Sequence, residues 1–380
     1  MHGDMDKGRE HRMEQIGKFS EEYRHKPFLS YAEYMDYIFA CANIQLADYI
    51  QGLKSKYATG QGGYKNIMYP DIEIAYQLCD TKIQQFFLAE EQTDSAGETE
   101  QEGETEEIDA ELADLLQGFA MSFGESEKPS TEETELSADE LLAFVDDRIA
   151  ATDMTQMRFP FYDICSKLSF QPFTVFCLAC AILSSTQTSY ASVFQIINEN
   201  GSLTTPTIES AARVYFANRY SITDVYSQMS VSLEQLLPIM DLRVNSQMPF
   251  STLIAPDKRL IDYLFGSHPF RLDENYQRFM KRLTDDKELN PIMANAQILE
   301  AMDISYNKGV RIFSYYGDEG SGRKFFVKQF CKSHGMEAIT LNCKKLFVYD
   351  YSFIEKAIWA VCRECIFTNA CCCLDDLTYR

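Results

Sequence analysis

The sequence predicts a mostly helical chain whose C-terminal part begins an α/β domain. Three observations support this fold class. Apolar residues recur at helical spacing through most of residues 28–88 and 139–285. Glu, Thr, Ser and Gly dominate residues 89–138, which separate these two helical blocks. Residues 310–376 alternate short β-branched or apolar runs with a helical pattern, which is typical of parallel strands joined by helices.

The composition limits the classes of function. The 380 residues include 46% hydrophobic types and carry a formal net charge of −22. A chain this acidic is not expected to bind nucleic acid or anionic membranes. Residues 1–6 are polar, unlike a signal peptide, and the longest apolar run, residues 172–183, is too short to span a bilayer. We therefore expect a cytoplasmic protein with no membrane anchor.

The chain contains 12 cysteines. Cys177 and Cys180, and likewise Cys362 and Cys365, have the spacing of zinc ligands, but both pairs fall inside apolar helical runs. Residues 371–373 are three consecutive cysteines in a predicted buried strand. Buried cysteine often acts as a small hydrophobic side chain, so we interpret all of them as core residues, with a metal site as the less favoured alternative. A cysteine-rich core also suits a reducing compartment.

Residues 1–88 are predicted to form an N-terminal helical region. Residues 28–50 carry a wide apolar stripe behind the N-cap residue Ser30, and we interpret this stripe as a surface that packs against a neighbouring helix. A second helix is predicted for residues 71–88. Residues 1–27 are charged, have no apolar period and are expected to be a frayed arm.

Residues 89–138 are predicted to be a disordered acidic linker, because they contain few apolar residues that could anchor a core. Residues 108–119 nevertheless carry Ile, Leu and Phe at helical spacing. A short recognition helix is therefore an alternative to a simple tether.

Residues 139–285 are predicted to be a second helical domain. Ser137 and Glu140 have capping-box spacing ahead of its first helix. Thr205 is expected to be the N-cap of a later helix, with Pro206 at its first position.

A glycine-rich turn lies between residues 310–316, expected to be a strand, and residues 325–330, expected to be a helix. Glycines at such a turn let backbone N–H groups converge on an anion, and the following helix N-terminus adds partial positive charge. The turn is predicted to be a phosphate-binding loop, with an ordinary strand-to-helix turn as the alternative. The candidate phosphate-binding residues are Gly317, Asp318, Glu319, Gly320, Ser321, Gly322, Arg323 and Lys324.

Two positions depart from the usual phosphate-loop motif. Arg323 stands at the position of the phosphate lysine, and Lys324 stands where the motif has Ser or Thr. Arg323 keeps the positive charge but has a planar fork in place of a point charge. An ammonium has only donors, so Lys324 cannot replace a hydroxyl as a Mg²⁺ ligand.

An acidic pair follows the last predicted strand. Residues 336–342 and 370–374 are expected to be strands, and Ser352 with Glu355 has capping-box spacing ahead of the helix between them. Asp375 and Asp376 come directly after the second strand. Two acids at such a place can hold Mg²⁺ and polarise water, although an ordinary solvated strand end is the alternative.

The order of several individually weak motifs resembles the bacterial AAA+ ATPases that carry a variant winged-helix domain ahead of the ATPase module. In that family an L-S-x-F-E pattern, an aromatic helix and a P-T helix start precede an R-I-x-x-Y-L-x-G segment. The matching residues here are 168–173, 190–194, Pro206 with Thr207, and 259–266. The resemblance covers about residues 140–380.

The resemblance implies a winged-helix-like fold for residues 139–285 and the N-terminal part of an AAA+ P-loop domain for residues 286–380. It implies ATP and Mg²⁺ as cofactors, with Asp375 as the metal ligand and Asp376, one methylene shorter than the usual Glu, as the catalytic residue that activates water. A sensor residue, an arginine finger and a lid would follow Arg380, so the sequence is expected to be a fragment.

The sequence and the resemblance leave three functions to consider. The first is an ATP-driven remodelling or assembly factor that works as a homo-oligomeric ring and binds a protein client through its N-terminal region. Some members of the family accompany contractile injection systems, whose components are therefore candidate clients. The second is a non-hydrolysing adaptor with a degenerate nucleotide site. The third, a winged-helix nucleic-acid binder, conflicts with the net charge of −22.

Overall fold

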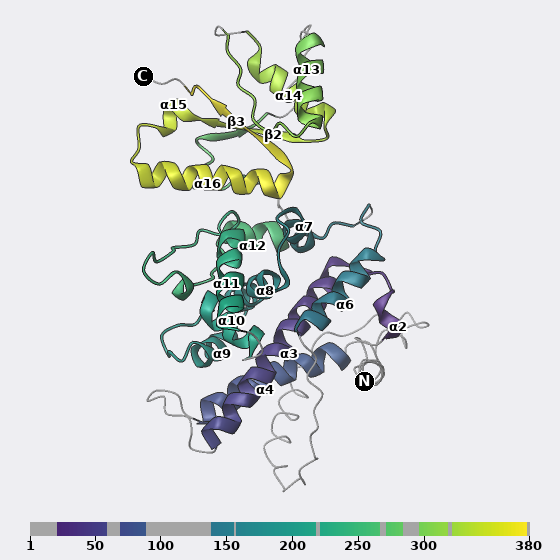
Figure 1. Cartoon of the computed structure of the whole chain (residues 1–380), viewed down its shortest axis with the longest axis vertical. Helices are drawn as coiled ribbons and strands as arrows, with labels where there is room; N and C mark the ends of the chain where they lie inside the picture. Colours follow the sequence, from purple (N-terminus) through teal and green to yellow (C-terminus); the bar gives the residue numbers. More distant parts are fainter. Residues whose placement is uncertain are drawn as a thin grey trace, which may run out of the picture. The chain divides into compact units, whose positions relative to one another are not determined.

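The protein is mostly helical and has one small three-stranded mixed sheet among the residues described by this computed structural model (Figure 1). The mostly helical class is thereby confirmed. The chain divides into two compact units, Met1–Asp48 with Gln77–Thr152 and Tyr49–Tyr76 with Asp153–Arg380. The described residues are 21–58, 69–88, 138–155, 157–217, 221–266, 271–283, 296–317 and 321–377. Residues 1–20 of the predicted arm and residues 89–137 of the acidic linker lie outside them. Residues 21–27 were also predicted to be part of the frayed arm, and this is wrong, because they include helix α2 Glu21–Arg24 and the ion pair of Arg24 with Asp147.

Helices α3 and α4 form much of the first unit, although both run on into segments of the second, and they confirm the two N-terminal helices predicted from the sequence. The bounds of the helices are α2 Glu21–Arg24, α3 Tyr31–Ala58, α4 Tyr69–Leu88 and α6 Ala138–Ala150. Ser30 Oγ accepts a hydrogen bond from the N–H of Glu33 at 3.1 Å, which confirms Ser30 as the N-cap of α3.

A buried arginine joins the end of α6 to the start of α3. Arg148 of α6 donates to the carbonyl oxygen of Lys26 at 2.9 Å and to the carboxylate of Glu33 at 2.7 Å. Its guanidinium also lies over the rings of Phe28 and Tyr37, 4.1 Å and 4.5 Å from their centroids. A planar cation with several donors can satisfy both kinds of contact at once, whereas an ammonium cannot.

The second unit contains a block of short helices around α8, of whose 15 residues ten are buried. Cys177 and Cys180 lie on α8 and are buried, in agreement with their interpretation as core residues. The bounds are α7 Pro160–Lys167, α8 Pro172–Thr186, α9 Tyr190–Ile197, α10 Ile208–Phe216, α11 Ile222–Leu236, η2 Pro249–Ser251 and α12 Lys258–Phe265.

Helix α10 begins two residues later than predicted. Thr207, not Thr205, is its N-cap, and Thr207 and Ser210 exchange side-chain to backbone hydrogen bonds of 2.8 Å and 3.0 Å. Pro206 therefore lies before the helix, and its carbonyl accepts from the N–H of Ile254 at 2.8 Å, next to an isolated bridge between Thr207 and Leu253.

The described part of residues 139–285 contains this isolated bridge and one strand, β1 Met280–Arg282. Strand β1 pairs antiparallel with β2 Glu337–Asn342 of the α/β part. The winged-helix assignment therefore stays a prediction from the family resemblance.

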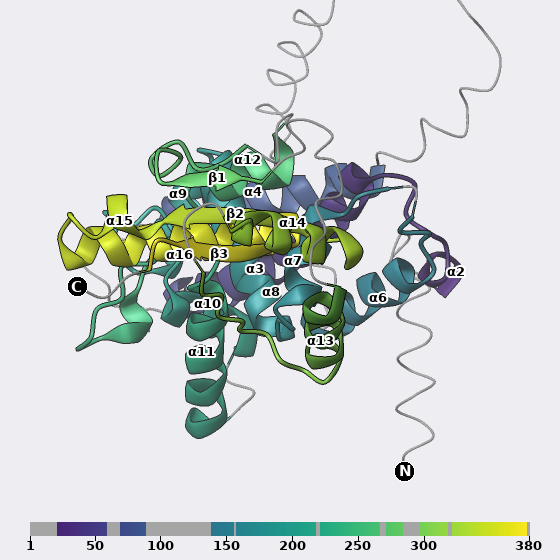
Figure 2. The same cartoon turned by 90° about the horizontal axis from the view of Figure 1, so that it is seen from above.

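The sheet has the order β1-β2-β3, with β3 at Ala370–Asp375 (Figure 2). Strands β2 and β3 are parallel, so that Glu337 lies beside Ala370 and Asn342 beside Asp375. These two strands confirm the predicted ones. The helices of this part are α13 Ala296–Asn307, α14 Arg323–Ser333, α15 Cys343–Leu346 and α16 Tyr351–Thr368.

Helix α16 starts one residue before Ser352, so the predicted Ser352–Glu355 capping box is wrong. Asp350 is the N-cap instead, and its carboxylate accepts from the N–H of Phe353 at 3.0 Å. Asp and Ser are both favoured at the N-cap of a helix. The carboxylate of Asp350 also carries a negative charge, which the helix N-terminus stabilises.

The strand predicted for residues 310–316 is also wrong, because this segment pairs with no strand in the described part of the chain. Its side chains still alternate. Phe313 and Tyr315 are half-buried in a cluster that includes Phe330, whereas Ile312 and Tyr316 are 88% and 93% exposed. The segment is held by its aromatic side chains rather than by a hydrogen-bond ladder.

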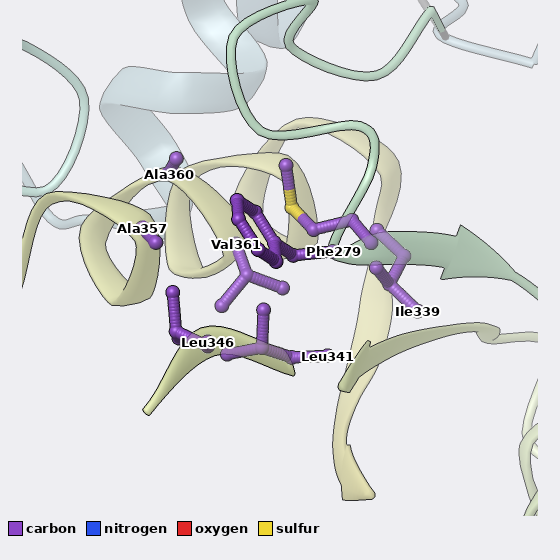
Figure 3. Close-up of a cluster of buried hydrophobic side chains, with 8 residues drawn as sticks. Phe279, Ile339, Leu341, Leu346, Ala357, Ala360 and Val361 are labelled. Carbon is purple, nitrogen blue, oxygen red and sulfur yellow. The ribbon is translucent and has the colours of Figure 1, made fainter. Parts of the chain in front are cut away.

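The sheet is covered on both faces by helices (Figure 1). On one face, Phe279, Ile339, Leu341 and Val361 belong to a core between the strands and α16 (Figure 3). On the other face, α13 and α14 pack against the sheet through a second cluster. Its buried members are Met302, Val327, Phe330, Cys331 and Ala338. Of the helices described, none is both long and apolar enough to cross a membrane.

Candidate functional site

The candidate site lies where α14 begins and β3 ends. Helix α14 is followed directly by β2 and packs on it, and β2 runs parallel to β3. A helix that returns along a strand in this way has its N-terminus at the carboxyl edge of the strands, where ligands bind in open α/β sheets. The topology therefore brings the glycine-rich turn and the acidic pair to one edge of the sheet.

The described ends of the turn are Gly317, Ser321 and Gly322, and Asp318, Glu319 and Gly320 lie outside the described residues. Gly322 is the N-cap of α14, with a left-handed φ of 77°, and its carbonyl accepts from the N–H of Phe326 at 3.0 Å. A left-handed residue without a Cβ is favoured here because any other side chain adds strain. A Cβ on Gly317 would lie only 2.8 Å from Ser321 Oγ, so the two ends of the turn approach closely.

Lys324 and Asp375 form an ion pair across this edge. Lys324 Nζ lies 2.5 Å from Asp375 Oδ2, and the side chains are 54% and 19% exposed. The hydrogen bond to Asp375 raises the pKa of the Lys324 ammonium above its ordinary value, because it stabilises the charged form. Arg323, the neighbouring cation, is exposed.

Asp376 lies just beyond the ion pair. It has a left-handed φ of 57°, which Asp tolerates better than most residues, and it is exposed. Its carboxylate is close enough to Lys324 to contribute to the raised pKa of the ammonium. The site thus combines two cations at a helix N-terminus with one paired and one exposed carboxylate.

The arrangement does not fit a protein-bound Mg²⁺ ion. The ammonium of Lys324 already takes Oδ2 of Asp375, the only ligand expected from the sequence. Within the described ranges, no three Asp, Glu, His or Cys side chains gather closely enough to hold a metal ion. A cation at Asp375 would have to displace Lys324 first.

The sequence missed the arrangement of cysteines around β3. This strand was expected to be buried, yet Cys372 is exposed and Cys371 and Cys373 are only half-buried. The reason is that β3 is an edge strand, paired with β2 alone among the described strands. Alternation along β3 was the available signal, since it predicts that neighbouring thiols point to opposite faces.

Comparisons of the chain with protein-family models, with curated proteins and with solved structures find no match.

Proposed function

We propose that this chain binds ATP at the edge formed by the glycine-rich turn and the end of β3, as an AAA+ protein does. The observation that carries the proposal is the pairing of Lys324 with Asp375 at 2.5 Å, because it joins the two motifs that the sequence singled out. Phosphates are the ligand class that such an edge suits. Backbone N–H groups at the start of α14, the helix dipole and two adjacent cations all favour an anion there.

The same ion pair favours the adaptor over the active ATPase. Asp375 is neutralised by Lys324 and does not offer a free oxygen pair to a metal ion. Phosphoryl transfer to water needs charge stabilisation and a positioned nucleophile. The side chain of Asp376 is short for positioning this nucleophile. We therefore propose nucleotide binding with slow hydrolysis.

The family resemblance extends the proposal in two ways. A ring of several copies would be the working form, and the helices of the first unit would bind a protein client. Both extensions rest on the order of sequence motifs around residues 168–173 and 259–266, and neither is needed for the nucleotide site.

The test compares two glycines of one helix. Gly322 and Gly335 flank α14, have φ of 77° and 65°, and have open space where a Cβ would lie. Replacing either by Ala should therefore cost about the same, ~1–2 kcal/mol, in folding free energy. Titration of a fluorescent ATP analogue should show weaker binding for Gly322→Ala and unchanged binding for Gly335→Ala. Equal affinities in the two variants, or no binding to the native chain, would refute the proposal.

A further inference from the structure

Helix α11 carries one apolar stripe, and only the second half of this stripe is covered. The stripe consists of six residues at helical spacing, Ile222, Val225, Tyr226, Met229, Leu233 and Leu236. At 3.6 residues per turn, their side chains fall within about 100° of the helix surface. Leu233 and Leu236 are buried, whereas Ile222 and Tyr226 are 89% and 58% exposed. Figure 2 shows one end of α11 projecting beyond α8 and α10. We call the first four residues of the stripe the open stripe.

The 3-10 helix η2 widens this apolar surface. Tyr226 lies edge-on against Phe250 of η2, with ring centroids 4.8 Å apart and the ring planes at 89°. Met248, just before η2, is 60% exposed. The contact with Phe250 holds the Tyr226 ring in place, so the ring loses little conformational freedom when another surface packs on it. Tyr and Met are also residue types that are enriched at protein interfaces.

The open stripe carries no charged side chain. Residues 222–233 include one charged residue, Asp224, which lies about 150° around the helix from the centre of the stripe. Its carboxylate accepts a hydrogen bond from the hydroxyl of Ser221. The whole chain has a net charge of −22, so two copies repel each other wherever their acidic surfaces approach. An uncharged apolar surface can meet its own copy without this repulsion, which favours a second copy of this chain as the occupant.

We propose that two copies of this chain associate through the open stripe, with their α11 helices antiparallel. In a two-fold contact each surface meets itself. Ile222 of each copy therefore packs against Met229 of the other, and the two Tyr226 rings lie near each other. The antiparallel arrangement also points the two helix dipoles in opposite directions, which is the favourable orientation.

The size of the open stripe limits the strength of this contact. Eight helical residues, 222–229, extend over only ~12 Å. A contact of this length buries less than the ~800 Å² per partner that is typical of a stable interface. The dimer is therefore weak and depends on concentration. It uses no residue of the glycine-rich turn or of β3, and it does not require nucleotide.

The test measures the mass of the full chain by sedimentation at increasing concentration into the high micromolar range, without nucleotide. We expect a reversible monomer–dimer equilibrium. Tyr226→Glu should raise the dissociation constant more than about tenfold, because each copy would bury an unpaired carboxylate. Ser227→Glu is the matched control, since it adds the same charge at the next position, which is exposed and points away from the stripe. Its dissociation constant should stay close to that of the native chain.

A mixing experiment shows whether the stripe meets itself. Tyr226→Glu and Tyr226→Lys should each be monomeric alone, and an equal mixture should form a dimer because the two new charges attract. Circular dichroism checks that each variant is folded. A native chain that stays monomeric at every concentration would leave the stripe to a different protein and overturn the proposal. An oligomer that Tyr226→Glu leaves intact, or equal weakening by Ser227→Glu, or a mixture that stays monomeric, would overturn it as well.

Discussion

Arg259 of α12 and Glu364 of α16 form a two-pronged ion pair in the interior of the second unit. Nε donates to Oε1 at 2.6 Å and Nη2 donates to Oε2 at 2.7 Å, and both side chains are buried. Next to it, Arg363 binds Asp257 and Asp273. The rings of Tyr263 and Phe367 stack 4.2 Å apart on the same two helices. Residues 259–266, one of the motifs behind the AAA+ resemblance, thus fasten the helical block to the α/β part.

Breaking this pair should destabilise the protein strongly. Glu364→Ala leaves the Arg259 guanidinium buried without its partner, which typically costs about 3–5 kcal/mol. The double variant Arg259→Met with Glu364→Leu removes both charges and should recover most of that loss. The measurement is the free energy of unfolding from urea denaturation.

The control is the exposed pair of Arg271 and Glu274, whose side chains are 64% and 50% exposed. Glu274→Ala should change the free energy of unfolding by less than about 1 kcal/mol. A loss as large as that of Glu364→Ala would show that burial is not the cause.

The stability of the protein should depend on the shape of the Arg148 side chain and not only on its charge. Its guanidinium binds two backbone carbonyls and Glu33 and lies over two aromatic rings. Arg148→Lys keeps the charge but loses the planar fork, so we expect a clearly lower thermal midpoint than for the native chain. Arg24→Lys, at an exposed pair with Asp147, is the control and should leave the midpoint nearly unchanged. Equal midpoints for both lysine variants would contradict this reasoning.

Apolar periodicity predicted the helices and two strands well, because an element that buries one face has apolar residues at regular spacing in the sequence. It failed at residues 310–316, where the alternation of Phe313 and Tyr315 is real but no described strand pairs with the segment. Residue types that favour strands indicate which side chains are buried, but they do not indicate whether the backbone pairs with another strand. Competition between nearby caps, such as Asp350 and Ser352, is likewise decided by a difference of a fraction of a kcal/mol.

The site shows the same limit. Glycine spacing singled out Gly322 and Lys324, and strand composition singled out Asp375, but the sequence assigned Lys324 to phosphate and Asp375 to metal. Their mutual pairing is a tertiary contact that depends on where α14 returns to the sheet. The exposure of Cys372 depends on the position of β3 at the edge of the sheet, which the local sequence does not reveal.

The role of Lys324 in nucleotide binding can be separated from its role as a structural partner. Lys324→Met should weaken binding of the ATP analogue, whereas the exposed Lys332→Met on the same helix should not. Asp375→Asn frees the ammonium and should strengthen binding about fivefold, equivalent to an exposed ion pair of ~1 kcal/mol. If Lys324 serves only the ion pair, then neither Lys324→Met nor Asp375→Asn will change the affinity.

The final prediction concerns hydrolysis. In the native chain the ammonium of Lys324 occupies Asp375, so turnover should stay well below the ~1 s⁻¹ that is common for enzymes. Lys324→Thr removes the ammonium, frees the Asp375 carboxylate and supplies the hydroxyl that the usual phosphate-loop motif has at this position. Phosphate release, measured at saturating ATP and Mg²⁺, should therefore rise in Lys324→Thr.

Lys324→Met is the matched control, because it also frees Asp375 but offers no hydroxyl. Its rate should stay at or below that of the native chain. A native rate near ~1 s⁻¹, or a lower rate in Lys324→Thr than in the native chain, would show that the ion pair does not restrain hydrolysis. Equal gains in the Thr and Met variants would assign the effect to Asp375 alone, since the freed carboxylate is the one feature that both variants share.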